Sequence, residues 1–303
     1  MEKMMENEKE SKSIIIYHSA DFDGFASGGL LSYAFPDAEL LPLNYGYDIP
    51  WDRIEGKNVY MADFSFQPVE DMKKLVEISN TLTWIDHHDS TIQAIYKAYP
   101  EMKDLEGIRD KKFAGCELTW KHLFPNRSMP FWLILLGRFD VWDQSDMEFW
   151  DNRIEPFQLG MNSYIGDPLK NPIFMRELIS DGTIEGKRVD QIIDQGVIIR
   201  KYRDLQDKIA LKASTFGKWD GHSTIALNGS GKGSQPFGNI LNEYDMGIVY
   251  KYSGKINEWV FSVYSTKMDI SELARSMGGG GHPGASGFQV KDLGKMKEII
   301  GME

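Results

Sequence analysis

Acidic and histidine side chains gather in three short segments of the first 90 residues. They are His18, Asp21, Asp23, Asp63, Asp86, His87 and His88. Carboxylate oxygens combined with one or two imidazoles suit manganese, magnesium or a related divalent ion. Two such ions about 4 Å apart that share one carboxylate form a common arrangement for hydrolysing phosphoesters. A lone aspartate of this kind would more often cap a helix, but the set as a whole predicts a hydrolytic metal site.

A fourth acidic segment follows the apolar stretch 130–139. Asp140 and Asp143 both lie there, and the sequence leaves open which of the two would join the other ligands. Surface aspartates after a helix are common and usually inert, so this segment is ambiguous by itself.

A glycine-rich segment near the end of the chain is a candidate anion-binding loop. Glycines let backbone N–H groups approach an anion closely, and arginine binds phosphate through two parallel hydrogen bonds. A bare glycine run is more often a flexible hairpin, but the flanking arginine and histidine favour phosphate or nucleotide binding. The predicted substrate-binding residues are Arg275, Gly279, Gly280, Gly281 and His282.

The elements that must position these residues follow a repeating pattern. Short apolar stretches at 13–17, 58–62 and 81–85 predict strands, and each ends at one of the acidic segments. Helical spacing follows at 25–34, at 69–78 and from about Ser90. Strands that alternate with helices indicate an α/β fold with a parallel sheet. Ligands bind such sheets at the carboxyl ends of the strands, so the three segments are expected to converge on one edge.

The rest of the chain predicts a second domain. Helices are expected at 114–124 and 130–139, a long charged helix at about 184–214, and strands at 223–227, 246–252 and 259–264. This pattern predicts a disordered tail at 1–12, a catalytic domain at 13–185, a helical linker at 186–214 and a smaller α/β domain at 215–303. Aromatic residues around Tyr264 and Phe288 suit contact with a nucleobase.

Composition narrows the class of protein. A chain of 303 residues favours two domains, and its single cysteine, Cys116, excludes an intramolecular disulfide framework or a cysteine-based zinc cluster. The net charge of −11 argues against a protein that coats long nucleic acid with a basic surface. No apolar stretch approaches the ~20 residues that span a bilayer, and the charged N-terminus lacks the apolar stretch of a signal peptide. We therefore expect a cytoplasmic protein without a membrane partner.

The ordered motifs resemble those of the DHH phosphoesterase superfamily. They are His-x-x-Asp-x-Asp-Gly at 18–24, Asp63, Asp86-His87-His88 and Asp140, and the stretch 278–287 looks like the signature of the DHH-associated C-terminal domain. The resemblance covers residues 14–290. The superfamily includes nucleases that act on short oligonucleotides and phosphatases that act on bisphosphate nucleotides.

The resemblance implies a role for each residue. One divalent ion would be held by His18, Asp21 and Asp63, and a second by Asp23, Asp63, His87 and Asp140, with Asp63 as the bridge. The ions would be manganese, with Mg²⁺ or Co²⁺ as alternatives. His88 would contact the scissile phosphate, and His88 and Asp86 are the predicted catalytic residues.

Together these features predict a metal-dependent phosphodiesterase that hydrolyses short RNA or DNA oligonucleotides, or dinucleotides, to mononucleotides. Alternatives are a phosphomonoesterase acting on 3′,5′-bisphosphate nucleotides and a cyclic dinucleotide phosphodiesterase. Polyphosphate or pyrophosphate hydrolysis is less favoured, and a non-catalytic nucleotide sensor is the alternative outside enzymes. A homodimer is compatible with every one of these functions.

Overall fold

A computed structural model describes residues 12–163, 178–179, 186–229 and 233–302. The chain divides into two compact units, residues 1–199 and 200–303, and each is described by itself. The predicted tail at 1–12 falls outside the described residues except for its last residue. Within the described ranges, no helix combines the length and apolar character that crossing a membrane requires.

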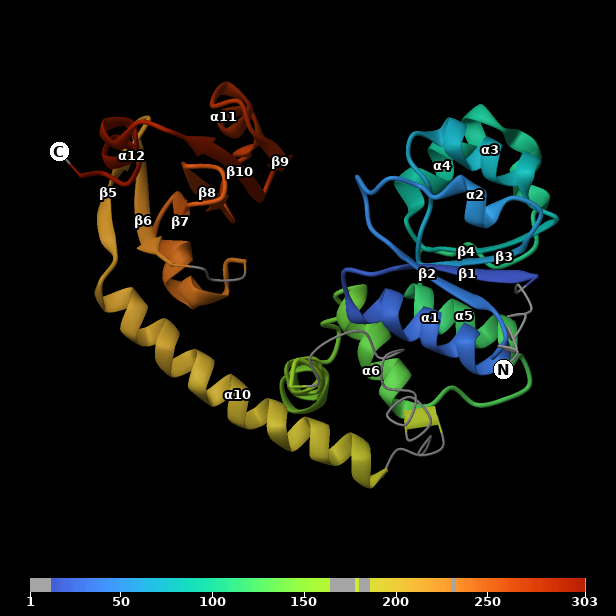
Figure 1. Ribbon diagram of the computed structural model, residues 1–303. Helices are drawn as coiled ribbons and strands as arrows, with labels where there is room; N and C mark the ends of the chain where they lie inside the picture. Colours follow the sequence, from blue (N-terminus) through green and yellow to red (C-terminus); the bar gives the residue numbers. More distant parts are fainter. Residues whose placement is uncertain (1–11, 164–177, 180–185, 230–232, 303) are drawn as a thin grey trace, which may run out of the picture. The chain divides into compact units, whose positions relative to one another are not determined.

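The first unit is built on a parallel sheet whose described strands run in the order β2–β1–β3–β4 (Figure 1). The strands are β1 (Ser13–His18), β2 (Glu39–Leu43), β3 (Asn58–Ala62) and β4 (Thr81–Ile85). Ile16 of the central strand pairs with Leu41 on one side and Met61 on the other. The isoleucines at 14–16 are all fully buried, as expected for a strand covered on both faces. The predicted α/β class and parallel sheet are confirmed.

Helices cover both faces of this sheet (Figure 1). One face carries α1 (Phe22–Ala34) and α5 (Gly115–Leu123), against which α6 (Phe131–Asp140) packs, and the other carries α2 (Trp51–Ile54), α3 (Val69–Ile78) and α4 (Asp89–Ala98). Small residues let α1 approach the sheet closely: a Cβ atom at Gly28 would lie 2.6 Å from the ring of Tyr17. The close approach brings the start of α1 to the end of β1.

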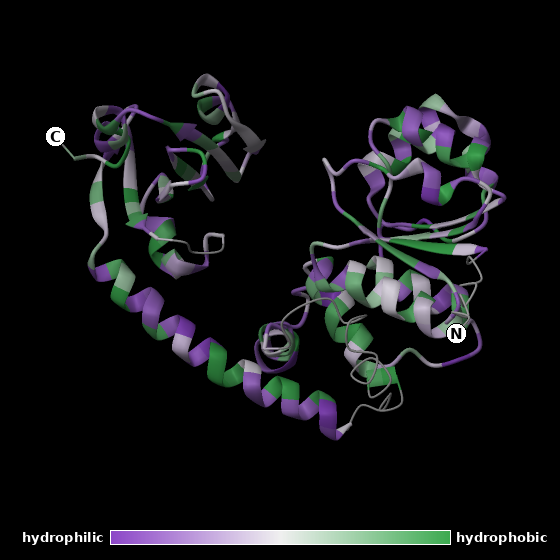
Figure 2. Ribbon diagram, in the orientation of Figure 1, coloured by the Kyte–Doolittle hydropathy of each residue, from purple (hydrophilic) through white to green (hydrophobic). Residues whose placement is uncertain are grey.

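Shorter helices complete the first unit. They are η1 (Pro100–Asp104), α7 (Met147–Phe149), η2 (Trp150–Ile154) and α8 (Glu155–Met161). The long helix α10 (Lys187–Lys212) follows, close to the helix predicted at 184–214. Its purple surface is interrupted by green apolar bands (Figure 2), and Val189, Ile192 and Ile193 are buried in the same apolar core as Phe157 of α8.

The second unit contains a mixed sheet whose described strands run in the order β5–β6–β7–β8–β10–β9. Its elements are β5 (Thr215–Trp219), β6 (His222–Asn228), η4 (Gln235–Glu243), β7 (Met246–Ser253), β8 (Glu258–Tyr264), α11 (Ser271–Ser276), β9 (Gly280–His282), β10 (Ala285–Val290) and α12 (Leu293–Ile299). The three strands predicted here are confirmed as β6, β7 and β8. The expectation that Phe288 contacts a nucleobase is wrong, because its ring is buried and stacks on Phe261 in the core.

Candidate metal centre

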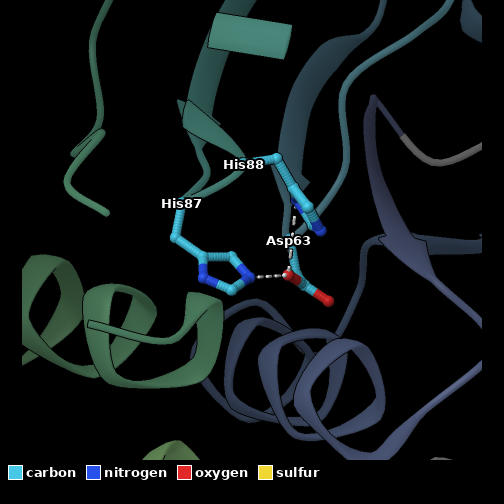
Figure 3. A group of neighbouring side chains, drawn as sticks. All are labelled: Asp63, His87 and His88. Atoms are coloured by element: carbon cyan, nitrogen blue, oxygen red, sulfur yellow. Dashed lines mark ion pairs between the residues drawn. The ribbon is translucent and has the colours of Figure 1, made fainter. Parts of the chain in front are cut away.

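Strand ends bring the predicted residues together at one edge of the first sheet. His18 ends β1, Asp63 follows β3, and His87 and His88 follow β4. Figure 3 shows both histidines directed toward Asp63, whose Oδ1 atom lies 3.2 Å from Nε2 of His87 and 4.0 Å from Nδ1 of His88. Asp63 has a φ angle of 54°, a left-handed conformation that aspartate adopts more readily than most residues. The carboxylate at the centre of the cluster thus sits where the strand turns abruptly.

His18 and Asp21 form one side of the cluster with Asp63. The Nδ1 atom of His18 lies 3.2 Å from Oδ2 of Asp21 and 3.7 Å from Oδ2 of Asp63. Asp21 also caps α1, since its Oδ1 atom accepts a hydrogen bond from the backbone N–H of Gly24. The capping role and the cluster role therefore use different oxygens of the same carboxylate.

His87 forms the other side of the cluster. Its Nε2 atom lies 3.6 Å from Oδ2 of Asp23 and 3.5 Å from Oδ2 of Asp140. Asp143, by contrast, accepts hydrogen bonds from the backbone and side chain of Ser145. Of the two aspartates that the sequence left open, the structure brings Asp140 to the cluster.

Asp23 is held in place by the start of α5. Its two carboxylate oxygens accept hydrogen bonds from the backbone N–H groups of Gly115, at 2.8 Å, and Cys116, at 2.7 Å. The N-terminus of a helix favours a negative charge at this position. Position 115 requires glycine, because a Cβ atom there would lie 2.6 Å from Cβ of Asp63. Helix α5 therefore approaches the cluster with its backbone.

The electrostatics of the cluster show an excess of negative charge. Burial and the charges of Asp63 and Asp140 raise the pKa of Asp23 well above its usual value. Burial also raises the pKa of Asp140 to about 6, with protonated His87 opposing the shift and Asp63 adding to it. Burial alone would lower the pKa of His18, but the carboxylates of Asp21 and Asp63 raise it to about 10. Each shift favours bringing a positive charge into the cluster.

The arrangement fits divalent cations. The side-chain atoms of three groups lie close enough together to share an ion. The groups are His18–Asp21–Asp63, Asp23–His87–Asp140 and Asp63–His87–His88. Nδ1 of His18 and Oδ1 of Asp63 are buried, and neither has a hydrogen-bond partner of proper geometry within the described residues. Buried polar atoms left in this state are costly, and a cation would satisfy both.

Asp86 lies beneath His88 and is fully buried. Its Oδ1 atom is 2.7 Å from Nδ1 of His88 and accepts hydrogen bonds from the backbone N–H groups of His87 and His88. Its other oxygen accepts a hydrogen bond from the hydroxyl of Ser65. Burial alone would lower the pKa of His88, but Asp86 and Asp63 raise it to about 9. Asp86 therefore holds the ring of His88 in position.

Several residues at the cluster were not predicted from the sequence. Oδ1 of Asn44 lies 3.2 Å from Nε2 of His18 and can accept a hydrogen bond from it, and the ring of Tyr45 lies 5.5 Å from that of His18. Both residues follow β2, an edge strand of the described sheet. Glu39 and Pro42 interrupt its apolar pattern, so the sequence did not predict this strand. Ser65 and Gly115 were missed as well, because each acts through a contact made only in the folded chain.

The predicted substrate-binding residues lie in the second unit. Gly280 and Gly281 form the short exposed strand β9 with His282, and this strand pairs with β10 in a hairpin. The guanidinium of Arg275 donates to the hydroxyl of Ser271. Gly279 packs so closely on the next strand that a Cβ atom would lie 2.0 Å from the carbonyl oxygen of Gly287. The hairpin accounts for Gly279 and Gly281, whereas a Cβ atom at Gly280 would meet nothing within 4 Å. The role of these glycines in binding substrate stays a prediction.

Comparison with known proteins supports the fold. No family model matches the sequence. The chain is 24% identical over 321 residues to uncharacterized protein R106 of Acanthamoeba polyphaga mimivirus, across 94% of this chain and 69% of that protein. A pGpG-specific phosphodiesterase, PggH from Vibrio cholerae, matches with a TM-score of 0.56 and 14% identity over 95% of this chain and 96% of that one.

An exopolyphosphatase-related protein from Bacteroides fragilis matches with a TM-score of 0.40 and 15% identity, over 95% of this chain and 90% of that one. That similarity is too low to support an argument. The match to PggH shows a shared fold, in agreement with the DHH-type fold that the motifs resemble.

Proposed function

We propose that this protein is a metal-dependent phosphodiesterase that hydrolyses dinucleotides or short oligonucleotides to mononucleotides. The proposal rests on one observation: two groups of carboxylate and histidine side chains share the carboxylate of Asp63. The name of PggH, which has the same fold, gives pGpG as its substrate. That substrate is a nucleotide phosphodiester, which favours this reaction over a phosphomonoesterase or a nucleotide sensor.

We assign the ligands as the resemblance implies. His18, Asp21 and Asp63 would hold one divalent ion, and Asp23, Asp63, His87 and Asp140 would hold the other. When bound, such ions lower the pKa of water and offset the charge that develops on phosphoryl oxygens. The donor set of oxygens and imidazoles suits Mn²⁺, with Mg²⁺ and Co²⁺ as alternatives.

The side chains themselves have separate tasks. His18 must be neutral at Nδ1 to bind a cation, so metal uptake releases the proton that its raised pKa otherwise retains. Asp86 fixes His88 through Nδ1, which leaves Nε2 to donate a hydrogen bond. With a pKa of about 9, His88 is protonated near neutral pH and can neutralise charge on the scissile phosphate or protonate a leaving oxygen.

We further propose that the second unit binds the end of the substrate through Arg275, Gly279, Gly280, Gly281 and His282. An arginine beside backbone N–H groups suits a terminal phosphate. The division into a catalytic domain at 13–185, a linker at 186–214 and a substrate-binding domain at 215–303 belongs to this proposal. A cytoplasmic location and a homodimer are also part of the proposal.

A substrate panel tests the proposal. Metal-free protein would be supplied with Mn²⁺, Mg²⁺ or Co²⁺ and assayed on dinucleotides, a 3′,5′-bisphosphate nucleotide, a cyclic dinucleotide and pyrophosphate. We expect the highest kcat/KM on dinucleotides and complete loss of activity in EDTA. A preference for the bisphosphate nucleotide would instead identify a phosphomonoesterase, and binding without hydrolysis of any substrate would identify a sensor.

A further inference from the structure

A pocket lies beside the metal cluster in the first unit. Its cavity volume is about 130 Å³, smaller than the roughly 300–1,000 Å³ of a site that encloses a whole small molecule, so it can take one ring system of a ligand. Its walls include Asn44, Tyr45, Tyr47, Phe64, Phe66 and Gln67. These residues follow β2 and β3, so the pocket lies at the carboxyl edge of the sheet, where ligands of such folds bind.

Two residues connect the pocket to the cluster. Oδ1 of Asn44 lies 3.2 Å from Nε2 of His18. The ring of Tyr45 lies 5.5 Å from that of His18 and 4.8 Å from that of Phe64. The wall of the pocket is therefore in contact with a proposed metal ligand, and a molecule bound there would lie next to the cluster.

The lining of the pocket is aromatic and uncharged. Tyr45 and Tyr47 are 40% and 60% exposed, while Phe64 and Phe66 are buried. None of the described lining residues is Asp, Glu, Lys or Arg. The adjacent carboxylates would repel an anion, so the pocket suits a neutral planar ring better than a phosphate group. The amide groups of Asn44 and Gln67 can hydrogen-bond to the edge of such a ring.

We infer that this pocket binds the nucleobase next to the scissile phosphate. The inference rests on the proposed function, since a nucleotide substrate is what would bring a base to this position. Stacking on an aromatic side chain tolerates every base, because each has a π-face. The pocket thus makes the first unit selective for nucleotides over phosphoesters without a base.

Abasic substrates test this inference. Hydrolysis of a dinucleotide would be compared with that of two analogues, each lacking one base. We expect the wild-type protein to favour the intact dinucleotide over one analogue, and Tyr45→Ala or Tyr47→Ala to reduce this preference on the order of tenfold, as for loss of one stacking contact. Tyr33→Ala removes another exposed tyrosine, on α1, and should retain the preference. Wild-type preference in both pocket variants would overturn the inference.

A binding measurement separates the pocket from the proposed reaction. 2-Aminopurine riboside is an uncharged nucleoside whose fluorescence falls when its base stacks, and it can be titrated with the protein in EDTA. We expect quenching by wild-type and Tyr33→Ala protein, with affinity reduced at least about fivefold in Tyr45→Ala. If dinucleotides are not hydrolysed, the proposed function is overturned, and this titration still tests whether the pocket binds a base. Equal quenching by Tyr45→Ala would overturn the pocket, even in an active enzyme.

Discussion

The Oδ1 atom of Asp86 lies 2.7 Å from Nδ1 of His88 and also accepts the backbone N–H of the same histidine. These two contacts fix the orientation of the His88 ring, so that Nε2 faces away from the carboxylate of Asp86. Because Asp86 is fully buried, its charge acts on His88 with little screening by water.

Asp86→Asn should therefore change the pH profile as well as the rate. Burial lowers the pKa of His88, but Asp86, with Asp63 and Asp140, raises it to about 9, so removing the charge of Asp86 should lower that pKa. Protonated His88 would then be lost at lower pH, and the alkaline fall in kcat should move in the same direction. We expect kcat at neutral pH to drop on the order of 10²-fold. Asp89→Asn, an exposed neighbour paired with Lys111, is the control and should retain the wild-type profile.

Asp63→Asn should abolish turnover without unfolding the protein. Asparagine accepts the left-handed backbone of position 63, but it lacks the negative charge that two cations would share. We expect kcat/KM to fall by more than about 10²-fold, with the melting temperature of the metal-free protein preserved. Asp63→Ala should lose the same activity and also some stability, because alanine is strained in this conformation. Activity of Asp63→Asn within a few-fold of wild type would refute the two-metal assignment.

Asp140→Asn should stabilise the metal-free protein while weakening cation binding. The pKa of Asp140 is raised from 3.8 to about 6, so its contribution to folding is lost as pH rises through this interval and stays unfavourable above it. At pH 8 the variant should gain on the order of 1–3 kcal/mol. Calorimetry in EDTA and with added Mn²⁺ measures both effects. Asp143→Asn, outside the cluster, should show neither; the reverse pattern would transfer the ligand role to Asp143.

Gly115→Ala should disturb the cluster through the backbone of α5. The added methyl group would lie 2.6 Å from Cβ of Asp63, and relieving this clash must move α5 or the carboxylate. Overpacking of this kind costs about 1–3 kcal/mol, and we expect Mn²⁺ affinity and kcat to fall together. Gly254→Ala, where the new Cβ atom meets nothing within 4 Å, is the control. Unchanged Mn²⁺ affinity in Gly115→Ala would show that the site tolerates this shift.

Substrate preference should fall with length. A net charge of −11 repels a long polyanion, so chains of two to about five nucleotides should be hydrolysed with higher kcat/KM than a 20-mer. Arg275→Ala should raise KM for the short substrates more than it lowers kcat, as for a contact made equally before and during the reaction. Lys291→Ala is the control, an exposed cation of the same unit. Equal kcat/KM for a dinucleotide and a 20-mer would instead indicate a general exonuclease.

The sequence predicted the strands of the first sheet where apolar character is concentrated. The isoleucines at 14–16 and residues 82–85 are buried on both faces, and the stretch ending at Ala62 buries three of its five residues, so all three strands appear as apolar runs. Among the described strands, β2 lies at the edge of the sheet and carries Pro42, so its apolar pattern is weaker. Missing β2 also meant missing Asn44 and Tyr45, and with them the pocket beside His18.

Some residues of the cluster could be predicted because they stand out in the sequence, as the adjacent histidines His87 and His88 do. The choice between Asp140 and Asp143 required the three-dimensional structure at the end of α6. The two residues are only three positions apart, yet Asp140 lies in the cluster and Asp143 accepts a hydrogen bond from Ser145. Gly115 had no distinguishing context. Its backbone N–H binds a carboxylate 92 residues earlier in the chain, and its lack of a side chain leaves room for Asp63.

That long separation has a consequence for biosynthesis. Asp23 is made early, but the N–H groups that orient it belong to residues 115 and 116, and the cluster is completed by Asp140. A nascent chain that has exposed only its first 90 residues carries most of the acidic and histidine side chains but cannot yet hold them in this arrangement. The site therefore assembles only after the segment through α6 has left the ribosome, and the proposed metal ions would be loaded late in the synthesis of the first unit.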